Sequence, residues 1–157
     1  MKIIITLAGI AFLTFMVLRL FSGGGNAKEN IRIGEEFLTK NALEPDIKTT
    51  DSGLQYQVLE EGTGSVHPTA KDKVTVHYHG TLIDGTVFDS SVDRGETIAF
   101  GLNQVIKGWT EGVQLMVLGE KTRFFIPSTL AYGNRKAGKI EAGSTLVFEI
   151  ELLGINE

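Results

Sequence analysis

The sequence contains no cysteine. This absence excludes disulfide bonds, thiolate nucleophiles and a lipidated N-terminal cysteine, but it leaves the redox compartment open because a disulfide-free domain is stable in either one. An excess of basic charge is missing too, since the formal net charge is -4 and the pI is about 5.4. Nucleic-acid backbones select positively charged surfaces, so we expect no nucleic acid among the partners.

Charge is also absent from residues 3–18, which read IIITLAGIAFLTFMVL. At about 1.5 Å per residue a helix of this run spans about 24 Å, whereas the hydrocarbon core of a bilayer is about 30 Å thick. A spanning helix is therefore feasible if Arg19 snorkels and if Leu20 and Phe21 extend the apolar run. We expect residues 1–21 to be a single-pass anchor in a bacterial inner membrane, with the following domain in the periplasm.

Other interpretations of the N-terminal segment stay open. Gly25 and Ala27 are small residues placed for a cut after Ala27, and a cleaved signal would leave a soluble periplasmic protein. Arg19 at the end of the apolar run favours the uncleaved anchor, and a buried soluble helix is a third interpretation. Basic residues lie on both sides of the run, so the sequence does not fix the membrane orientation.

Residues 22–52 are expected to form a linker and one short amphipathic helix. Asn26 and Glu29 have the spacing of a helix-capping pair, and residues 28–42 repeat apolar side chains at helical spacing. We expect a helix of about four turns that ends before Pro45. Because such a helix is too short to be stable alone, it must pack on a partner helix or on the following domain, and we favour the docked arm.

From Leu54 onward the apolar residues alternate with polar ones, as in half-buried strands. Val74, Val76 and Tyr78 fall on one face of the clearest run. The strand-like runs are residues 54–59, 74–82, 96–102, 121–126 and 146–152. Gly-containing turns such as IDGT separate them, so an antiparallel sheet is expected.

One helix is expected within this region, around residues 107–116, with Trp109, Val113 and Met116 on one face. We therefore predict an α+β domain over residues 53–157. It is a curved antiparallel β-sheet of about five strands wrapped around one short α-helix, preceded by an N-terminal hydrophobic helix and a short amphipathic helix.

Conventional catalytic chemistry is mostly missing. His77 and His79 share a strand face, but no third ligand accompanies them, so we expect exposed strand histidines and no metal. Asp84 has a turn role in IDGT, and Ser90 and Ser91 lack a nucleophile motif. No phosphate-binding glycine loop is present. What stands out in the sequence is a concentration of aromatic side chains.

Motifs in the order VHYHGTLIDGTVFDSS, QVIKGWTEGVQLM, IPSTLAYG and LVFEIELL closely resemble the FK506-binding (FKBP) type of peptidyl-prolyl cis-trans isomerase, over about residues 53–157. The segments EEFLTKNA and SGLQYQVLEEG look like its bacterial macrophage-infectivity-potentiator branch. The resemblance implies proline-containing polypeptide clients, no cofactor, and binding of FK506-like macrolides. The extension here is short, so it leaves open whether the protein is a monomer or a dimer.

The resemblance also implies roles for individual residues. The implied catalytic positions are Tyr78, Phe88, Asp89, Ile106, Trp109, Tyr132 and Phe148. The implied substrate-binding positions are Val105, Ile98, Ala131 and Ile140. In this family picture Trp109 forms the pocket floor, the Ile106 N–H and the Tyr132 hydroxyl hold peptide carbonyls, and Asp89 approaches the twisting amide.

Rotation about an X-Pro bond needs no nucleophile, because a dry pocket that prefers the twisted amide lowers the barrier by differential binding. The sequence departs from the family at Glu96, where many relatives carry an apolar or aromatic residue, and in residues 134–144, which are cationic and lack a proline pair. Substrate preference is the property most affected. An alternative function remains, in which a membrane-tethered holdase chaperone or peptide-binding module uses the same groove without essential turnover.

Overall fold

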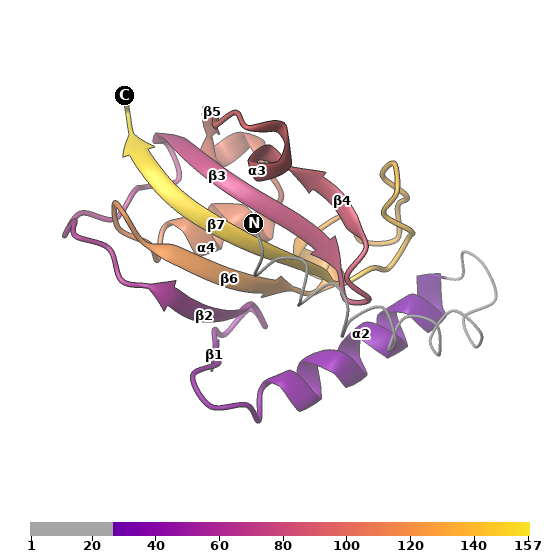
Figure 1. Ribbon diagram of the computed structural model, residues 1–157. Coiled ribbons are helices and arrows are strands. Elements are labelled where there is room, and N and C mark those ends of the chain that lie inside the picture. Colours follow the sequence, from indigo (N-terminus) through magenta and orange to yellow (C-terminus); the bar gives the residue numbers. More distant parts are fainter. Residues whose placement is uncertain (1–26) are drawn as a thin grey trace.

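The computed structural model describes residues 27–157 (Figure 1). The expected membrane anchor, the hydrophobic helix and the capping residue Asn26 lie outside the described residues. Within residues 27–157, no helix has the length and apolarity needed to cross a membrane.

A single curved sheet of seven strands forms the body of the described chain. Its strands are β1 (Lys48–Thr49), β2 (Gln55–Glu60), β3 (Lys73–Leu82), β4 (Val87–Ser90), β5 (Ile98–Gly101), β6 (Lys121–Ile126) and β7 (Leu146–Ile155). They are ordered β1-β2-β6-β7-β3-β4, and β5 also pairs with β3. All pairs are antiparallel, as expected from the short turns.

The long strands β3 and β7 lie at the centre of the sheet. Their register places Tyr78 opposite Ile150 and Gly80 opposite Phe148. The far edge of β3 is shared, because β5 pairs with its first half and β4 with its second half. Tyr78 lies between the part of β3 that pairs with β5 and the part that pairs with β4.

Helix α4 (Lys107–Val113) packs against the concave face of the sheet (Figure 1). Trp109 and Val113 are buried on this helix, which confirms that part of the predicted apolar face. Met116 is buried too, but it lies beyond the helix, which ends at Val113 and is shorter than expected. Gly108 and Gly112 face the sheet, and a Cβ on them would lie 2.5 Å from Ile126 and 2.7 Å from Phe124, respectively. The helix can therefore approach the strands closely only because these positions carry no side chain.

Helix α2 (Ala27–Asn41) is docked on the outside of the sheet, as expected. The rings of Phe37 and Phe125 are 6.1 Å apart, and the Asn30 side chain donates to the Ala142 carbonyl at 2.9 Å. Gly34 is the buried residue of the helix, in contact with Thr145. The helix thus joins both strand β6 and the loop that precedes β7.

The expectation of about five strands is wrong, because β1 and β4 were missed. Each has too few residues for an alternating pattern: two in β1 and four in β4. Short helical elements were missed as well: α3 (Ser91–Arg94), η1 (Leu102–Gln104) and η2 (Ser128–Leu130). The division between an extension and a domain at residue 53 stays a prediction, although β1 already belongs to the sheet.

The docking of α2 on the sheet can be tested by substituting Gly34. In a free helix Ala is more stable than Gly by about 1 kcal/mol. In this chain a Cβ at position 34 would lie 2.2 Å from the Thr145 Oγ1, so Gly34→Ala should lower the free energy of unfolding by about 1 to 3 kcal/mol.

Chemical denaturation measures this loss. The same substitution in a Thr145→Ala background should cost less, because the oxygen atom nearest the new methyl group is gone. A gain of about 1 kcal/mol from Gly34→Ala alone would show that α2 is not docked.

Candidate active site

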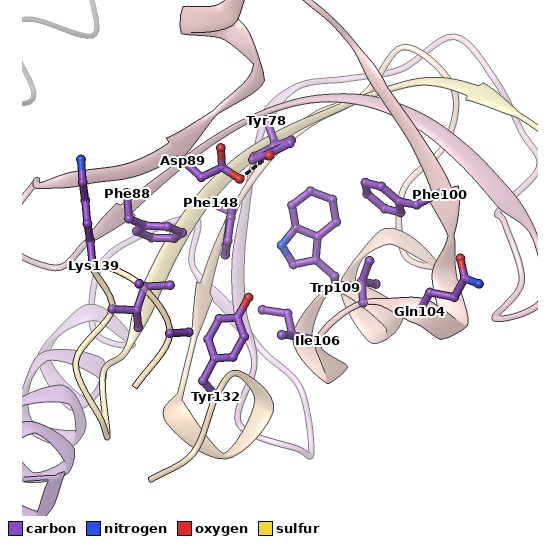
Figure 2. A pocket seen from close by; sticks show the side chains of 14 residues that line it. Tyr78, Phe88, Asp89, Phe100, Gln104, Ile106, Trp109, Tyr132, Lys139 and Phe148 are labelled. Carbon is purple, nitrogen blue, oxygen red and sulfur yellow. Dashed lines mark hydrogen bonds between the residues drawn. The ribbon is translucent and has the colours of Figure 1, made fainter. Parts of the chain in front are cut away.

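A cavity of about 690 Å³ opens between the concave face of the sheet, helix α4 and the loop before β7 (Figure 2). Aromatic side chains from separate elements line it: Tyr78, Phe88, Phe100, Trp109, Tyr132 and Phe148. Trp109 lies at its centre and is only 5% exposed. The volume is in the range of pockets that bind small organic molecules.

The rings are packed edge to face around Trp109. Its centroid is 5.2 Å from that of Phe148 with an interplanar angle of 88°, and 5.3 Å from that of Tyr78 with an angle of 81°. Phe88 continues the cluster, 5.3 Å from Phe148. Edge-to-face pairs place the positive edge of one ring on the negative face of the next, which holds each ring in one orientation. The cavity wall is therefore rigid and apolar.

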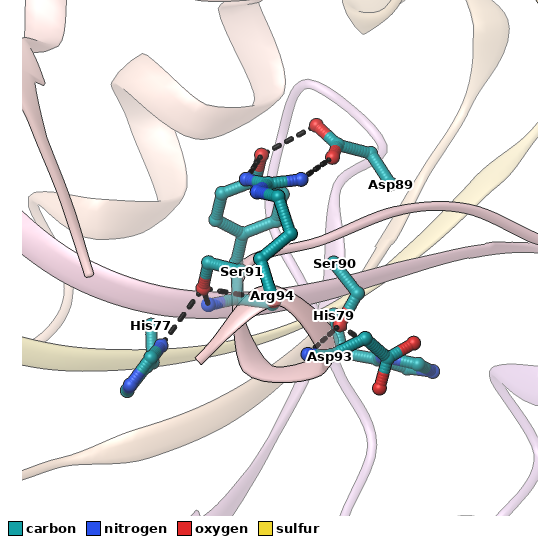
Figure 3. A network of polar contacts seen from close by, with 8 residues as sticks. His77, His79, Asp89, Ser90, Ser91, Asp93 and Arg94 are labelled. Atoms are coloured by element: carbon teal, nitrogen blue, oxygen red, sulfur yellow. Dashed lines mark hydrogen bonds and ion pairs between the residues drawn. The ribbon is translucent and has the colours of Figure 1, made fainter. Parts of the chain in front are cut away.

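One polar group at the rim is held by a small network (Figure 3). Asp89 accepts hydrogen bonds from the Tyr78 hydroxyl and from the Arg94 guanidinium, which also donates to the Tyr78 hydroxyl at 3.1 Å. Arg94 ends helix α3, which begins where the Ser90 hydroxyl accepts the Asp93 N–H at 3.1 Å. The Asp-Ser-Ser segment therefore supplies the carboxylate and starts the helix that carries its cation.

This network keeps Asp89 charged. Partial burial raises the pKa of Asp89, but the hydrogen bonds from Tyr78 and Arg94 outweigh it, so the pKa lies below its ordinary value. Burial and the bond to Asp89 raise the pKa of Tyr78, so its hydroxyl stays protonated and able to donate. The bonds to Tyr78 and Asp89 raise the pKa of Arg94.

A second layer of polar contacts fixes the backbone of β3 behind this network. The Ser91 hydroxyl accepts the Tyr78 N–H at 2.7 Å and lies 2.9 Å from the His77 Nδ1 (Figure 3). The His79 Nδ1 lies 2.8 Å from the Ser90 hydroxyl. The expectation of exposed histidines is wrong for His79, which is only 8% exposed beside Ser90 of the neighbouring strand β4. His77 is partly exposed.

Most of the residues implied by the resemblance meet at the cavity. The implied positions that line it are Tyr78, Phe88, Asp89, Val105, Ile106, Trp109, Tyr132, Ile140 and Phe148. Ile98 and Ala131 are not among the lining residues, although Ala131 packs against the core cluster. Ile98 is 37% exposed on the short edge strand β5, and the substrate-binding roles of both residues stay predictions.

Other lining residues were not predicted: Phe100, Gln104, Ala137, Gly138 and Lys139. Alternation within residues 96–102 places Phe100 on the same face as Ile98, so this signal was available. The loop residues had no such signal, because a non-repeating loop gives no periodicity. Among the described residues, no group of three or more His, Cys, Asp or Glu side chains is placed to hold a metal ion.

The sequence profile of the FKBP-type peptidyl-prolyl cis-trans isomerase matches residues 64–153. The chain belongs to the FKBP-type peptidyl-prolyl cis-trans isomerase family. A second profile, the domain amino terminal to this FKBP-type isomerase, matches residues 23–58. The extension that carries α2 is thus a recurring companion of the FKBP-type domain.

Individual relatives support this family membership. The chain is 60% identical over 132 residues to the FkpA isomerase of Aeromonas hydrophila, covering 84% of this chain and 49% of the relative. It is 46% identical to the outer membrane protein MIP of Legionella longbeachae, covering 83% of this chain and 56% of the relative. The crystal structure of FkpA from Escherichia coli superposes with a TM-score of 0.79 at 46% identity, covering 83% of this chain and 61% of that one. The chain spans about half the length of the first of these relatives.

The network at the rim can be tested by substituting Arg94. Arg94→Met removes a hydrogen bond and a positive charge that lower the pKa of Asp89, while the burial that raises it remains. The pKa of Asp89 should therefore rise, as measured by the carboxyl carbon resonance in an NMR titration. In the wild-type protein the carboxylate should stay charged as the pH falls to the ordinary aspartate pKa of about 3.9 and be protonated only below it.

Arg32→Met is the matched control, because Arg32 pairs with Glu29 and Glu36 on the surface of α2. That substitution should leave the Asp89 titration unchanged. Identical Asp89 curves in the wild-type and Arg94→Met proteins would contradict the network.

Proposed function

We propose that this chain is a peptidyl-prolyl cis-trans isomerase that accelerates X-Pro bond rotation in folding proteins. The observation that carries the proposal is the rigid aromatic cavity around Trp109, with the charged Asp89 at its rim. Membership of the FKBP-type family supports it. The cavity offers an apolar site for a proline ring and a polar edge for the adjoining peptide.

The physical basis of the rate enhancement is differential binding. Rotation about the peptide bond costs about 18 to 20 kcal/mol, because the twisted amide loses resonance. The twisted state is less charge-separated than the planar one, so transfer from water into a dry aromatic cavity costs the twisted amide less than it costs the planar amide. Interactions that are stronger with the twisted amide than with the planar amide lower the barrier, and no covalent step is needed.

The proposal assigns the orientation of the peptide to specific groups. Ile106 is the N-cap residue of α4, so its backbone N–H has no intrahelical partner. Within residues 27–157 the Tyr132 hydroxyl makes no hydrogen bond, and Figure 2 shows it directed into the cavity between Ile106 and Phe148. Both donors are therefore available to peptide carbonyls. Asp89 supplies a fixed negative charge near the rotating bond.

Proline-containing polypeptides are the proposed clients, and FK506-like macrolides are proposed to bind the same cavity. Its apolar walls and few polar groups are typical of sites that bury a hydrophobic ligand. FK506 should therefore compete with peptide substrates.

The test is the cis-to-trans rate of a Leu-Pro tetrapeptide with the full chain. We expect acceleration that FK506 inhibits, a loss of about tenfold or more in kcat/KM for Asp89→Asn, and a loss of about two- to tenfold for Tyr132→Phe. Tyr132 is 41% exposed, so its substitution should leave the folded state intact.

The surface variant Glu36→Gln is the control and should retain wild-type turnover. No acceleration by the folded wild-type chain would overturn the isomerase function. Prevention of client aggregation that survives unchanged in Asp89→Asn would then favour the chaperone or peptide-binding function.

We further infer that residues 1–21 anchor the protein in a bacterial inner membrane and that the domain lies in the periplasm. The uncharged run of residues 3–18 supports the anchor. One relative is named an outer membrane protein, which supports a location in the cell envelope but does not distinguish its two membranes. The full chain should remain in the membrane pellet after a carbonate wash, whereas a chain beginning at residue 28 should be released. Release of the full chain by carbonate, or cleavage after Ala27, would contradict the anchor.

A further inference from the structure

The rim of the cavity carries a positive charge that the proposed isomerisation does not use. The charged residues that line the cavity are Asp89 and Lys139. Asp89 is paired with Arg94, whereas Lys139 is exposed and has no ion pair within residues 27–157. The uncompensated charge at the cavity is therefore positive, although the whole chain has a formal net charge of -4.

A tight turn holds Lys139 in place. The backbones of Ala137 and Ile140 exchange hydrogen bonds of 2.9 Å in both directions, and Gly138 between them has a φ of 57°. Ile140 is 5% exposed and anchors the turn in the cavity wall. In Figure 2 the Lys139 side chain extends from this anchored turn away from Trp109 at the cavity floor.

Neighbouring charges strengthen the positive potential at this rim. The loop of residues 134–144 contains Arg135, Lys136 and Lys139 but only one acidic residue, Glu141. Lys136 lies 3.7 Å from Glu141 and is paired with it. Arg135 and Lys139 are left without an ion pair in the described part of the chain, so the loop keeps a net positive charge, and Lys139 is the one of these two residues that lines the cavity.

We propose that Lys139 is a specificity-determining residue that favours proline bonds with an acidic side chain directly beside the proline. The proposal rests on the proposed isomerase function. When the proline ring is in the aromatic cavity, the flanking side chain lies at the rim, where a carboxylate can reach the ammonium group. An exposed ion pair of this kind changes a rate or binding constant about two- to fivefold, and salt screens it.

The experiment measures kcat/KM by NMR exchange with peptides that carry neutral acetyl and amide ends. One series places Glu, Gln or Lys before the proline, a second places them after it, and a Leu-Pro peptide is the reference. For the wild-type protein we expect Glu to be preferred over Lys about two- to fivefold in at least one series, with Gln between them. The preference should shrink at about 1 M salt.

Variants assign the preference to one side chain. Lys139→Met should bring the ratio of kcat/KM for Glu and Lys peptides close to one. Lys139→Glu should make the Lys peptide the preferred substrate. Lys136→Met is the matched control, because Lys136 is on the same loop, is paired with Glu141 and does not line the cavity. It should retain the wild-type ratio.

The outcomes separate this proposal from the proposed function. If the wild-type protein does not accelerate the Leu-Pro peptide, the isomerase function itself fails. If it turns over Leu-Pro but treats Glu and Lys alike in both series, only the role of Lys139 is overturned. A ratio that persists in Lys139→Met would also overturn it.

Discussion

The close packing of helix α4 against the inner face of the sheet is the constraint on which the site depends. Glycines at positions 108 and 112 let the helix approach Ile126 and Phe124, and this approach places Trp109 among Tyr78 and Phe148. The helix covers only part of the concave face. The cavity is the uncovered part, and its floor is the same tryptophan that completes the core.

The polar half of the site depends on a different local constraint. Asp89 is on a short edge strand, and its partner Arg94 is on a helix of four residues that could not form in isolation. The Ser90 and Ser91 hydroxyls hold this segment by capping α3 and by bonding the backbone of Tyr78. The serines that have no nucleophile motif in the sequence thus have a structural role, which is to position the carboxylate.

The sequence predicts the parts of the fold that follow from periodicity. The inward faces of β3, β6 and β7 and the apolar face of α4 could be read from it, because each has a repeat of sufficient length. Phe125 is a residue whose burial this reasoning does not predict. Alternation places it on the outer face of β6, yet it is 7% exposed because Phe37 of the separate helix α2 covers it.

The resemblance to a known family predicts the site residue by residue. Periodicity supports only those predicted residues that lie on strands or on a helix. His79 and Lys139 were beyond both kinds of reasoning. His79 is buried because β4 returns along β3, and Lys139 reaches the rim because a turn folds against the wall through Ile140. One placement depends on the pairing of two strands and the other on a turn, and neither leaves a periodic pattern in the sequence.

The contacts of α2 continue into the wall of the cavity. Asn30 contacts Ala142, and Gly34 contacts Thr145. Both partners follow the turn that carries Lys139. Helix α2 also borders a small groove formed with Pro127 and Gly133, on either side of the η2 segment that leads to Tyr132. Helix α2 therefore packs beside the cavity wall, on residues that follow the wall residue Ile140 in the same loop.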